Sequence, residues 1–410
     1  MGKFELLVPA GSLPVLKTAV LYGADAVYIG GEAFGLRAKA KNFSLAEMKE
    51  GIDFAHQYGV KVYVTANIFA HQPDLEEIKA YFEELKTIVP DALIIADPGV
   101  LRTAQKVFTD MEYHISTQAN TTNTESYCFW YDLGVKRAVC ARELSLEEIK
   151  TIRQGIPEDM EIESFVHGAM CMAYSGRCLL SNYLSGMDAN NGECVQSCRW
   201  KYALVEEKRP NEYMPIEENE RGTYIFNSKD LCMIEYIPEL TDAGINSLKI
   251  EGRMKTALYV ATVARTYRKA LDDYQKDPEL YKKNLNWYKE EISKCTYREF
   301  TTGFYFQKSD RSTQIYENNT YVKNYIYLGT IETVTEDGLC QIEQKNKLSV
   351  GEEIEIMDFQ GENIQATILG MWNEEWESIE SAPHPKQKIY LDLGKAKGRL
   401  KEQQILRRKG

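Results

Sequence analysis

The stretch "FELLVPAGSLPVLKTAVLYGADAVYIGG", residues 4–31, contains one complete strand–helix–strand unit. Its two apolar runs, "FELLVPA" and "AVYIGG", have the length of buried strands, and residues 14–22 between them follow a helical pattern. Two successive strands that are connected by a helix run parallel in a sheet. This stretch therefore predicts an α/β fold in which helices cover a parallel sheet.

The same alternation continues to about residue 255. Six further strands are expected in "VKVYVTANI", "ALIIADPG", "EYHISTQAN", "VKRAVCARE", "MEIESFVHG" and "SLKIEGRM". Helices are expected between them, near residues 44–58, 74–89, 99–108, 123–133, 145–154 and 230–243. Eight β/α units indicate a TIM-type (β/α)8 barrel of about 250 residues. A doubly wound sheet is the competing fold, but the sequence contains neither GxGxxG nor GxxxxGK[ST].

Helix-terminus signals support these boundaries. Three pairs have the spacing of a capping box: Ser44 with Glu47, Asp74 with Glu77, and Ser145 with Glu148. Three glycines, Gly59, Gly134 and Gly244, follow helical stretches, where a left-handed residue commonly ends a helix.

Two domains are expected, a barrel domain over residues 1–300 and a β domain over residues 301–410. Residues from about 171 to 226 interrupt the alternation after the seventh strand and form a cysteine-rich insertion. From about residue 303 the apolar period changes to 2, which predicts a small antiparallel β-barrel. The last sixteen residues form a basic tail, with Glu402 as their one acid. We expect the β domain and this tail to help bind RNA.

Composition narrows the class of protein. Hydrophobic residues make up 44% of the chain, which is enough for a full core. The longest apolar runs are far shorter than the roughly 20 residues of a membrane span, and the start has no cleavable hydrophobic signal, so a cytoplasmic location is expected. The net charge of −12 argues against nucleic-acid binding over the whole surface and leaves room for a local basic patch.

Four of the nine cysteines gather in the insertion. Cys171, Cys178, Cys194 and Cys198 have the spacing C-x6-C-x15-C-x3-C. In a reducing compartment, clustered cysteines favour metal or redox chemistry. Four thiolates fit an iron–sulfur cluster or zinc, although the tight C-x2-C pairs of structural zinc sites are missing from the sequence. Four incidental buried thiols remain the third alternative.

The carboxyl ends of barrel strands and the loops after them form the active site in TIM-type barrels. Polar residues at or near the predicted strand ends are therefore candidates. The catalytic candidates are His167, Gln118 and Glu251. The substrate-binding candidates are Glu5, Asn67, Asp97, Arg142, Lys249 and Arg253. The last group includes three cations, which suit a carboxylate or phosphate. No HExxH helix and no GxSxG turn occurs in the sequence.

Three stretches carry a resemblance to a known family. "ESFVHGAMCMAYSGRCLLS" at residues 163–181 resembles the signature of the collagenase-like peptidase family U-32. "LLVPAGSLPVLKTAVLYGADAVYIGG" and "SLKIEGRMK" are also similar to that family, and the match spans roughly residues 4–270. "NGECVQSCRWKY", "NSKDLC" and the β domain resemble one branch, the tRNA hydroxylation proteins, which are implicated in forming 5-hydroxyuridine at the wobble position.

The resemblance implies a 4Fe-4S cluster held by Cys171, Cys178, Cys194 and Cys198, with Cys232 as a rival for the fourth place. It also implies a prephenate-linked hydroxylation of tRNA, with the dicarboxylate prephenate as a potential co-substrate. Two alternatives stay open. One is a peptidase, a hydrolase as the family label suggests. The other is a non-catalytic RNA-binding protein with a structural metal.

Overall fold

The computed structural model describes residues 4–31, 42–170, 178–187, 194–195, 197, 203–205, 213–215, 229–306, 321–384 and 386–410. These residues divide into two compact units. Unit 1 holds the β/α alternation and residues 298–321, and unit 2 holds residues 17–24, 255–297 and 322–410.

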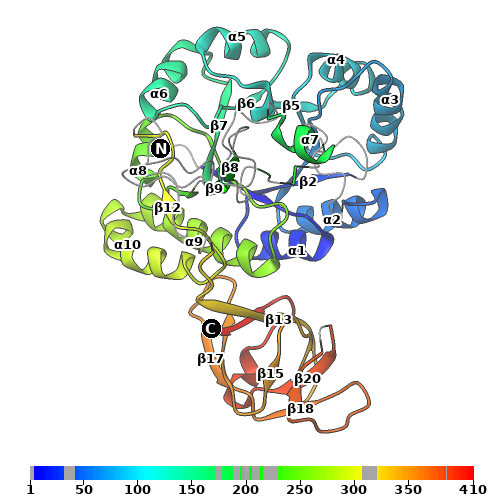
Figure 1. Ribbon diagram of the computed structural model, residues 1–410, viewed down its shortest axis with the longest axis vertical. Helices are drawn as coiled ribbons and strands as arrows, with labels where there is room; N and C mark the ends of the chain where they lie inside the picture. Colours follow the sequence, from blue (N-terminus) through cyan, green and yellow to red (C-terminus); the bar gives the residue numbers. More distant parts are fainter. Residues whose placement is uncertain are drawn as a thin grey trace. The chain divides into compact units, whose positions relative to one another are not determined.

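Unit 1 is built on a closed barrel of eight parallel strands (Figure 1). The strands are β1 (Glu5–Pro9), β2 (Ala26–Gly30), β3 (Lys61–Ala66), β4 (Ala92–Ile95), β5 (Glu112–Ile115), β6 (Arg137–Val139), β7 (Glu161–Ala169) and β11 (Ser247–Ile250). Strand β11 pairs in parallel with both β7 and β1, and this double pairing closes the barrel. All eight strands lie where the apolar runs predicted them, which confirms the TIM-type fold.

Helices connect the strands and surround them in Figure 1. They are α1 (Leu13–Leu21), α2 (Leu45–Gln57), α3 (Asp74–Leu85), α4 (Pro98–Val107), α5 (Thr124–Asp132), α6 (Leu146–Gly155) and α8 (Ile237–Asp242). Ser44 and Ser145 form the predicted capping boxes. The prediction at Asp74 is wrong, because Pro73 occupies the N-cap position and makes no side-chain cap. The three predicted C-terminal glycines all have positive φ.

The barrel carries an extension beside β7. Strand β10 (Asp230–Cys232) runs antiparallel to the end of β7, and β12 (Phe300–Thr301) pairs with β10. The helix expected over residues 230–243 is therefore shorter than predicted, because its first three residues form this strand. The helix and strands in the described parts of the inserted segment are α7 (Leu180–Ser185), β8 (Ala203–Val205) and β9 (Tyr213–Pro215).

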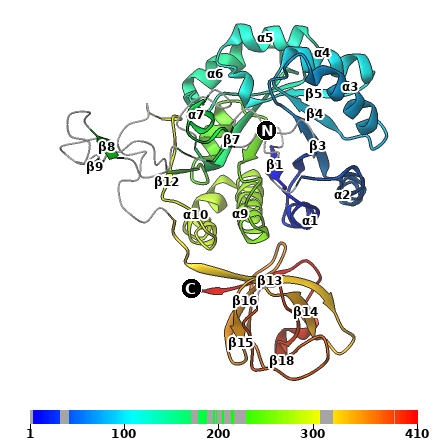
Figure 2. The ribbon, with the colours of Figure 1, turned by 45° about the vertical axis from the view of Figure 1, so that its right-hand side comes forward.

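Unit 2 combines two helices with a curved antiparallel sheet (Figure 2). The helices are α9 (Ala257–Lys276) and α10 (Pro278–Ile292). The sheet has the order β17 (Ile364–Thr367), β16 (Glu353–Met357), β21 (Ile405–Lys409), β13 (Tyr325–Val334), β14 (Cys340–Glu343), β20 (Lys388–Asp392) and β18 (Gly370–Trp372). The strands β15 (Leu348–Ser349) and β19 (Ser381–Ala382) pair separately, and a short 3-10 helix, η4 (Gly394–Arg399), precedes β21. The sheet forms a half-barrel with its own apolar core.

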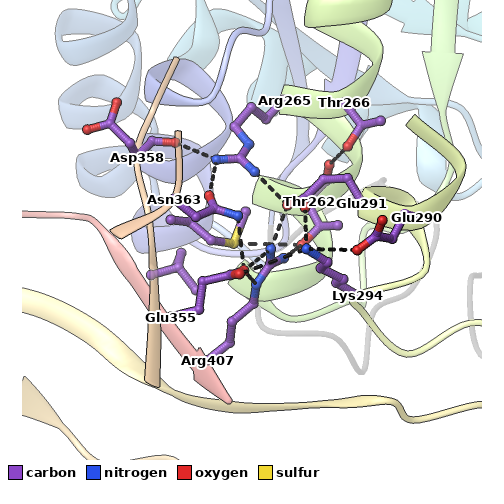
Figure 3. A network of polar contacts seen from close by, with 12 residues as sticks. Thr262, Arg265, Thr266, Glu290, Glu291, Lys294, Glu355, Asp358, Asn363 and Arg407 are labelled. Carbon is purple, nitrogen blue, oxygen red and sulfur yellow. Dashed lines mark hydrogen bonds and ion pairs between the residues drawn. The ribbon is translucent and has the colours of Figure 1, made fainter. Parts of the chain in front are cut away.

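The basic tail is a structural strand. Strand β21 lies between β16 and β13, and Arg407 is fully buried. Its guanidinium contacts the carboxylates of Glu355 and Glu291 (Figure 3). Glu291 of α10 also accepts a 2.5 Å hydrogen bond from Arg265 of α9. Residues 405–409 of the predicted basic tail therefore form part of the sheet, and the contact of the tail with RNA stays a prediction. The same network explains why α9 and α10 group with the sheet, so residue 300 is not the boundary between the units.

None of the helices in the described part of the chain is both long and apolar enough to span a bilayer.

Candidate active site at the carboxyl end of the barrel

The amino-terminal end of the barrel is closed by an ionic cluster. Arg137, the first residue of β6, contacts the carboxylates of Glu5 and Glu161, and Glu5 also accepts hydrogen bonds from Tyr63 at 2.6 Å and Ser247 at 2.8 Å. Burial opposes ionisation of Glu5, but the Arg137 charge and these bonds lower its pKa to about 2. Glu5 begins β1, so its expected position at a carboxyl strand end is wrong.

A buried ion pair deeper in the barrel is joined to this cluster, because Glu163 also accepts a 3.3 Å hydrogen bond from Arg137 Nη1. Lys249 Nζ donates to Glu163 Oε1 at 2.6 Å, and both side chains are buried. The ammonium also lies 4.6 Å from the centre of the Tyr28 ring. Because Glu163 balances its charge, Lys249 is part of the barrel interior. Its expected role as a cation that binds an anionic substrate is therefore not supported by its surroundings.

The carboxyl end of the barrel presents neutral hydrogen-bonding groups. Side chains of alternate residues point into a barrel, and Tyr63 of β3 meets His114 of β5 with ring centroids 4.7 Å apart. Asn67 and Ser116 continue these two inward rows past the strand ends, and Asn67 Nδ2 donates to Ser116 Oγ at 3.1 Å. Gln118 follows in a short 3-10 helix, η1 (Thr117–Ala119), and is buried. Asn67 Nδ2 and the Gln118 backbone amide both donate to Ser116 Oγ, which links these two candidates.

Arg253 and Glu251 follow β11 at the same end. Arg253 donates to Thr65 Oγ1 at 3.3 Å and to Asn42 Oδ1 at 2.8 Å. A Cβ atom at Gly30 would lie 2.4 Å from Arg253 Nη1, so glycine leaves the space that the guanidinium fills. Glu251 accepts a 3.2 Å hydrogen bond from the Tyr28 hydroxyl. Both candidates therefore lie at the barrel mouth, as predicted.

Arg142 is the cation best placed for an anion. It follows β6, its Nη1 donates to the Ala169 carbonyl at 2.8 Å, and its guanidinium lies 4.2 Å from the centre of the Phe165 ring. No carboxylate pairs with Arg142 within the described ranges, and its buried Nε has no partner there. A half-exposed guanidinium held by a ring and a carbonyl is suited to bind a carboxylate or phosphate.

Asp97 has a local structural role. It is the N-cap of α4, and its carboxylate accepts a 3.0 Å hydrogen bond from the Val100 amide. An aspartate in this position stabilises a helix by satisfying an amide that has no partner within the helix. It lies at a carboxyl strand end as expected, but its geometry supports capping and gives no sign of substrate binding.

His167 points away from the barrel interior. Strands β7 and β11 pair Phe165 with Lys249 and then His167 with Ile250, which leaves Val166 as a bulge. A one-residue bulge turns the following side chain to the other face. The His167 ring lies 5.6 Å from the Phe300 ring, and His167 is directly opposite Cys232 on β10. His167 therefore lies near the carboxyl end of β7 as expected, but it is paired with the cysteine-bearing strand β10, and its catalytic role stays a prediction.

Two of the four predicted metal ligands lie in described residues. Cys178 is partly exposed and Cys194 is exposed. Their segments are joined, because the Val195 amide donates to Ser181 Oγ at 3.1 Å. Cys171 and Cys198 lie outside the described residues. Among the residues that the structure describes, no three His, Cys, Asp or Glu side chains gather as a metal site. The four-cysteine set stays a prediction.

Three of the five scattered cysteines differ from these two, whereas Cys128 and Cys232 are partly exposed like Cys178. Cys140, Cys295 and Cys340 are buried, as expected for small apolar side chains. Burial raises the pKa of the Cys140 and Cys340 thiols to about 12. A metal ligand must be a thiolate, so Cys140 and Cys340 are unsuited to that role. Accessible Cys178 and Cys194 fit it.

Sequence reasoning missed several polar groups of the barrel mouth. Ser116, Asn120 and Thr121 accompany Gln118, and Thr65 contacts Arg253. The signal that would have found them is the polar run "STQANTT" directly after the fifth strand.

The fold and the polar residues at the carboxyl end of the barrel define the class of protein. It is a TIM-type barrel that also carries a cysteine-bearing segment. Residues 11–315 match the model of peptidase family U32, and residues 323–407 match the U32 C-terminal domain. The chain belongs to peptidase family U32.

Three relatives have names that describe different activities. One is "tRNA hydroxylation protein P1" of Bacillus subtilis, 41% identical, with 96% of this chain and 92% of that protein covered. A second is "23S rRNA 5-hydroxycytidine C2501 synthase" of Escherichia coli, 39% identical over 66% of this chain and 39% of that protein. The third is "Collagenase" of Porphyromonas gingivalis, 32% identical over 87% of each chain.

Proposed function

We propose that this protein is an iron–sulfur RNA-modifying enzyme that hydroxylates wobble uridine in tRNA to 5-hydroxyuridine, in a prephenate-linked reaction in the cytoplasm. The observation that carries the proposal is the 41% identity to a tRNA hydroxylation protein over 96% of this chain. A second relative, named as an rRNA 5-hydroxycytidine synthase, modifies the same ring position of a pyrimidine in RNA.

The barrel mouth supports this chemistry in two ways. Asn67 and Gln118 offer neutral hydrogen bonds, which suit an uncharged base turned out of its stack. Arg142 offers a positive charge without a carboxylate partner in the described part of the chain. An anionic co-substrate such as prephenate would bind there, because a guanidinium holds a carboxylate through two parallel hydrogen bonds.

The cysteine segment supplies the redox part of the proposal. Cys178 and Cys194 are accessible and their segments are held together, so they fit two of four thiolate ligands with Cys171 and Cys198. A cluster held by these cysteines would supply one-electron redox chemistry beside the barrel. His167 and Cys232 face each other on the neighbouring strands, and we propose that His167 acts there as a positioning residue.

Proteolysis is the second candidate function. It is favoured by the relative named Collagenase and by the cross-strand placement of Cys232 opposite His167, since a thiol beside an imidazole is the arrangement of cysteine peptidases. Purified protein incubated with casein or gelatin distinguishes the two. We expect no cleavage, and cleavage that disappears in Cys232→Ser would favour the peptidase.

Deletion of the gene tests the RNA function. In a strain with no other family member, we expect 5-hydroxyuridine-type modification to disappear from wobble uridines, measured by mass spectrometry of digested tRNA. Unchanged modification in that strain would overturn the proposal.

A further inference from the structure

The barrel mouth contains buried oxygens that lack partners. Asn67, Ser116, Gln118, Asn120 and Thr121 form what we call the neutral rim. Within the described residues, four of its side-chain oxygens, Asn67 Oδ1, Gln118 Oε1, Asn120 Oδ1 and Thr121 Oγ1, are shielded from solvent and accept no hydrogen bond.

These four oxygens are suited to accept hydrogen bonds from a ligand. A buried acceptor without a partner costs about 1–3 kcal/mol, and the large majority of buried side-chain polar atoms in proteins have a hydrogen-bond partner. Four unsatisfied oxygens at the ends of β3 and β5, where TIM-type barrels bind substrate, therefore indicate hydrogen-bond donors that arrive with a bound molecule.

Gln118 is the rim residue whose side chain can both donate a hydrogen bond to a ligand and accept one from it. Its backbone is fixed, since its amide donates to Ser116 Oγ at 3.4 Å and its carbonyl accepts from Asn120 Nδ2 at 2.8 Å. Its side-chain amide makes no hydrogen bond to any described residue. It therefore offers one donor and one acceptor side by side.

Asn67 differs from Gln118, because its Nδ2 is already used. The bond from Nδ2 to Ser116 Oγ leaves Oδ1 as the group still available, and Oδ1 is an acceptor. Asn67 therefore prefers a ligand that donates.

We propose that Gln118, assisted by Asn67, reads the hydrogen-bonding edge of the target pyrimidine and is the residue that determines base specificity. Uracil presents its N3–H donor next to a carbonyl acceptor, which complements the acceptor and donor of one amide. The five rim residues carry no charge, as suits a neutral base. Arg142 and Arg253 follow other strands, and the Arg253 guanidinium reaches Thr65 of β3. The inference rests on the proposed RNA function.

A change in the RNA tests this directly. The probe is an anticodon stem-loop RNA with either uridine or 3-methyluridine at the wobble position, since the methyl group removes the N3–H donor. Its affinity is measured by fluorescence anisotropy at one fixed salt concentration. We expect the wild-type protein to prefer uridine by about 10-fold or more, because a site built for a hydrogen bond rejects a ligand that lacks it.

Removal of the amide should abolish the preference. In Gln118→Ala, and in Gln118→Met, which keeps the length of the side chain, the ratio of the two affinities should fall toward 1. The matched control is Gln105→Ala, because Gln105 is an exposed amide on α4 that donates to the Leu133 carbonyl. This variant should keep the wild-type ratio.

Two results would overturn the inference alone: equal wild-type affinity for both RNAs, or a full preference retained in both Gln118 variants. The first would leave the rim oxygens to bound water. Failure of the wild-type protein to bind either RNA would instead reject the proposed RNA function, and the inference with it.

Discussion

Replacement of Arg407 by methionine should destabilise unit 2 while leaving unit 1 folded. The change removes a fully buried charge and leaves the carboxylates of Glu291 and Glu355 without their shared cation. Removal of one partner from a buried ion pair costs about 3–5 kcal/mol. Arg407, Arg265 and Lys294 together lower the pKa of Glu291 from 4.5 to about 2 despite its burial. Arg265 and Lys294 still contact Glu291 in the variant, so we expect a cost toward the lower end of this range.

Hydrogen exchange with mass spectrometry measures this loss where it occurs. A cost of 3–5 kcal/mol should speed exchange in peptides of α9, α10 and β21 by roughly 100- to 5,000-fold, up to the limit of global opening of unit 2. Arg408→Ala is the control, because Arg408 meets Glu352 at 3.2 Å at a partly exposed site, where a pair contributes about 0–1 kcal/mol. Similar exchange in both variants would refute the role given to the buried network.

Three further outcomes are expected. Glu5 and Glu291 each have a folded pKa near 2 against an ordinary 4.5, so their stabilisation is complete above about pH 4.5 and is lost as the pH falls toward 2, visible as a falling Tm. Anaerobically purified protein should be brown with about four irons per chain, and Cys178→Ala should bleach it while Cys340→Ala should not. Arg142→Ala should weaken prephenate binding by about 1.5–3 kcal/mol in titration calorimetry, and wild-type affinity in the variant would exclude this residue.

The barrel could be predicted from sequence because its signals are local. Apolar runs of strand length, such as residues 92–95, alternate with helices whose caps and terminal glycines are visible in the sequence. The charged interior could not be predicted in this way. Glu5 is held by Arg137, which is 132 residues away in the chain, so its role depends on contacts that no local pattern contains.

The site was harder to predict, because a shift of one residue in strand register changes which side chains point into the barrel. The bulge at Val166 turns His167 to the outer face, and no motif in the sequence marks it. Lys249 occupies the inward row that was expected, but its partner Glu163 becomes apparent only once β7 and β11 pair. The basic residues of β21 were interpreted as an exposed tail. They belong to a sheet strand, in which the charge of Arg407 is neutralised by acidic residues of α10 and β16.

The central claim is that this chain hydroxylates wobble uridine through its cysteine segment. Its most direct test is the amount of 5-hydroxyuridine in tRNA from a deletion strain that carries a plasmid copy of the gene, quantified by mass spectrometry. Wild-type and Cys340→Ala copies should restore the modification, and a Cys178→Ala copy expressed at the same level should not. Full restoration by Cys178→Ala, or no restoration by the wild-type copy, would contradict the account.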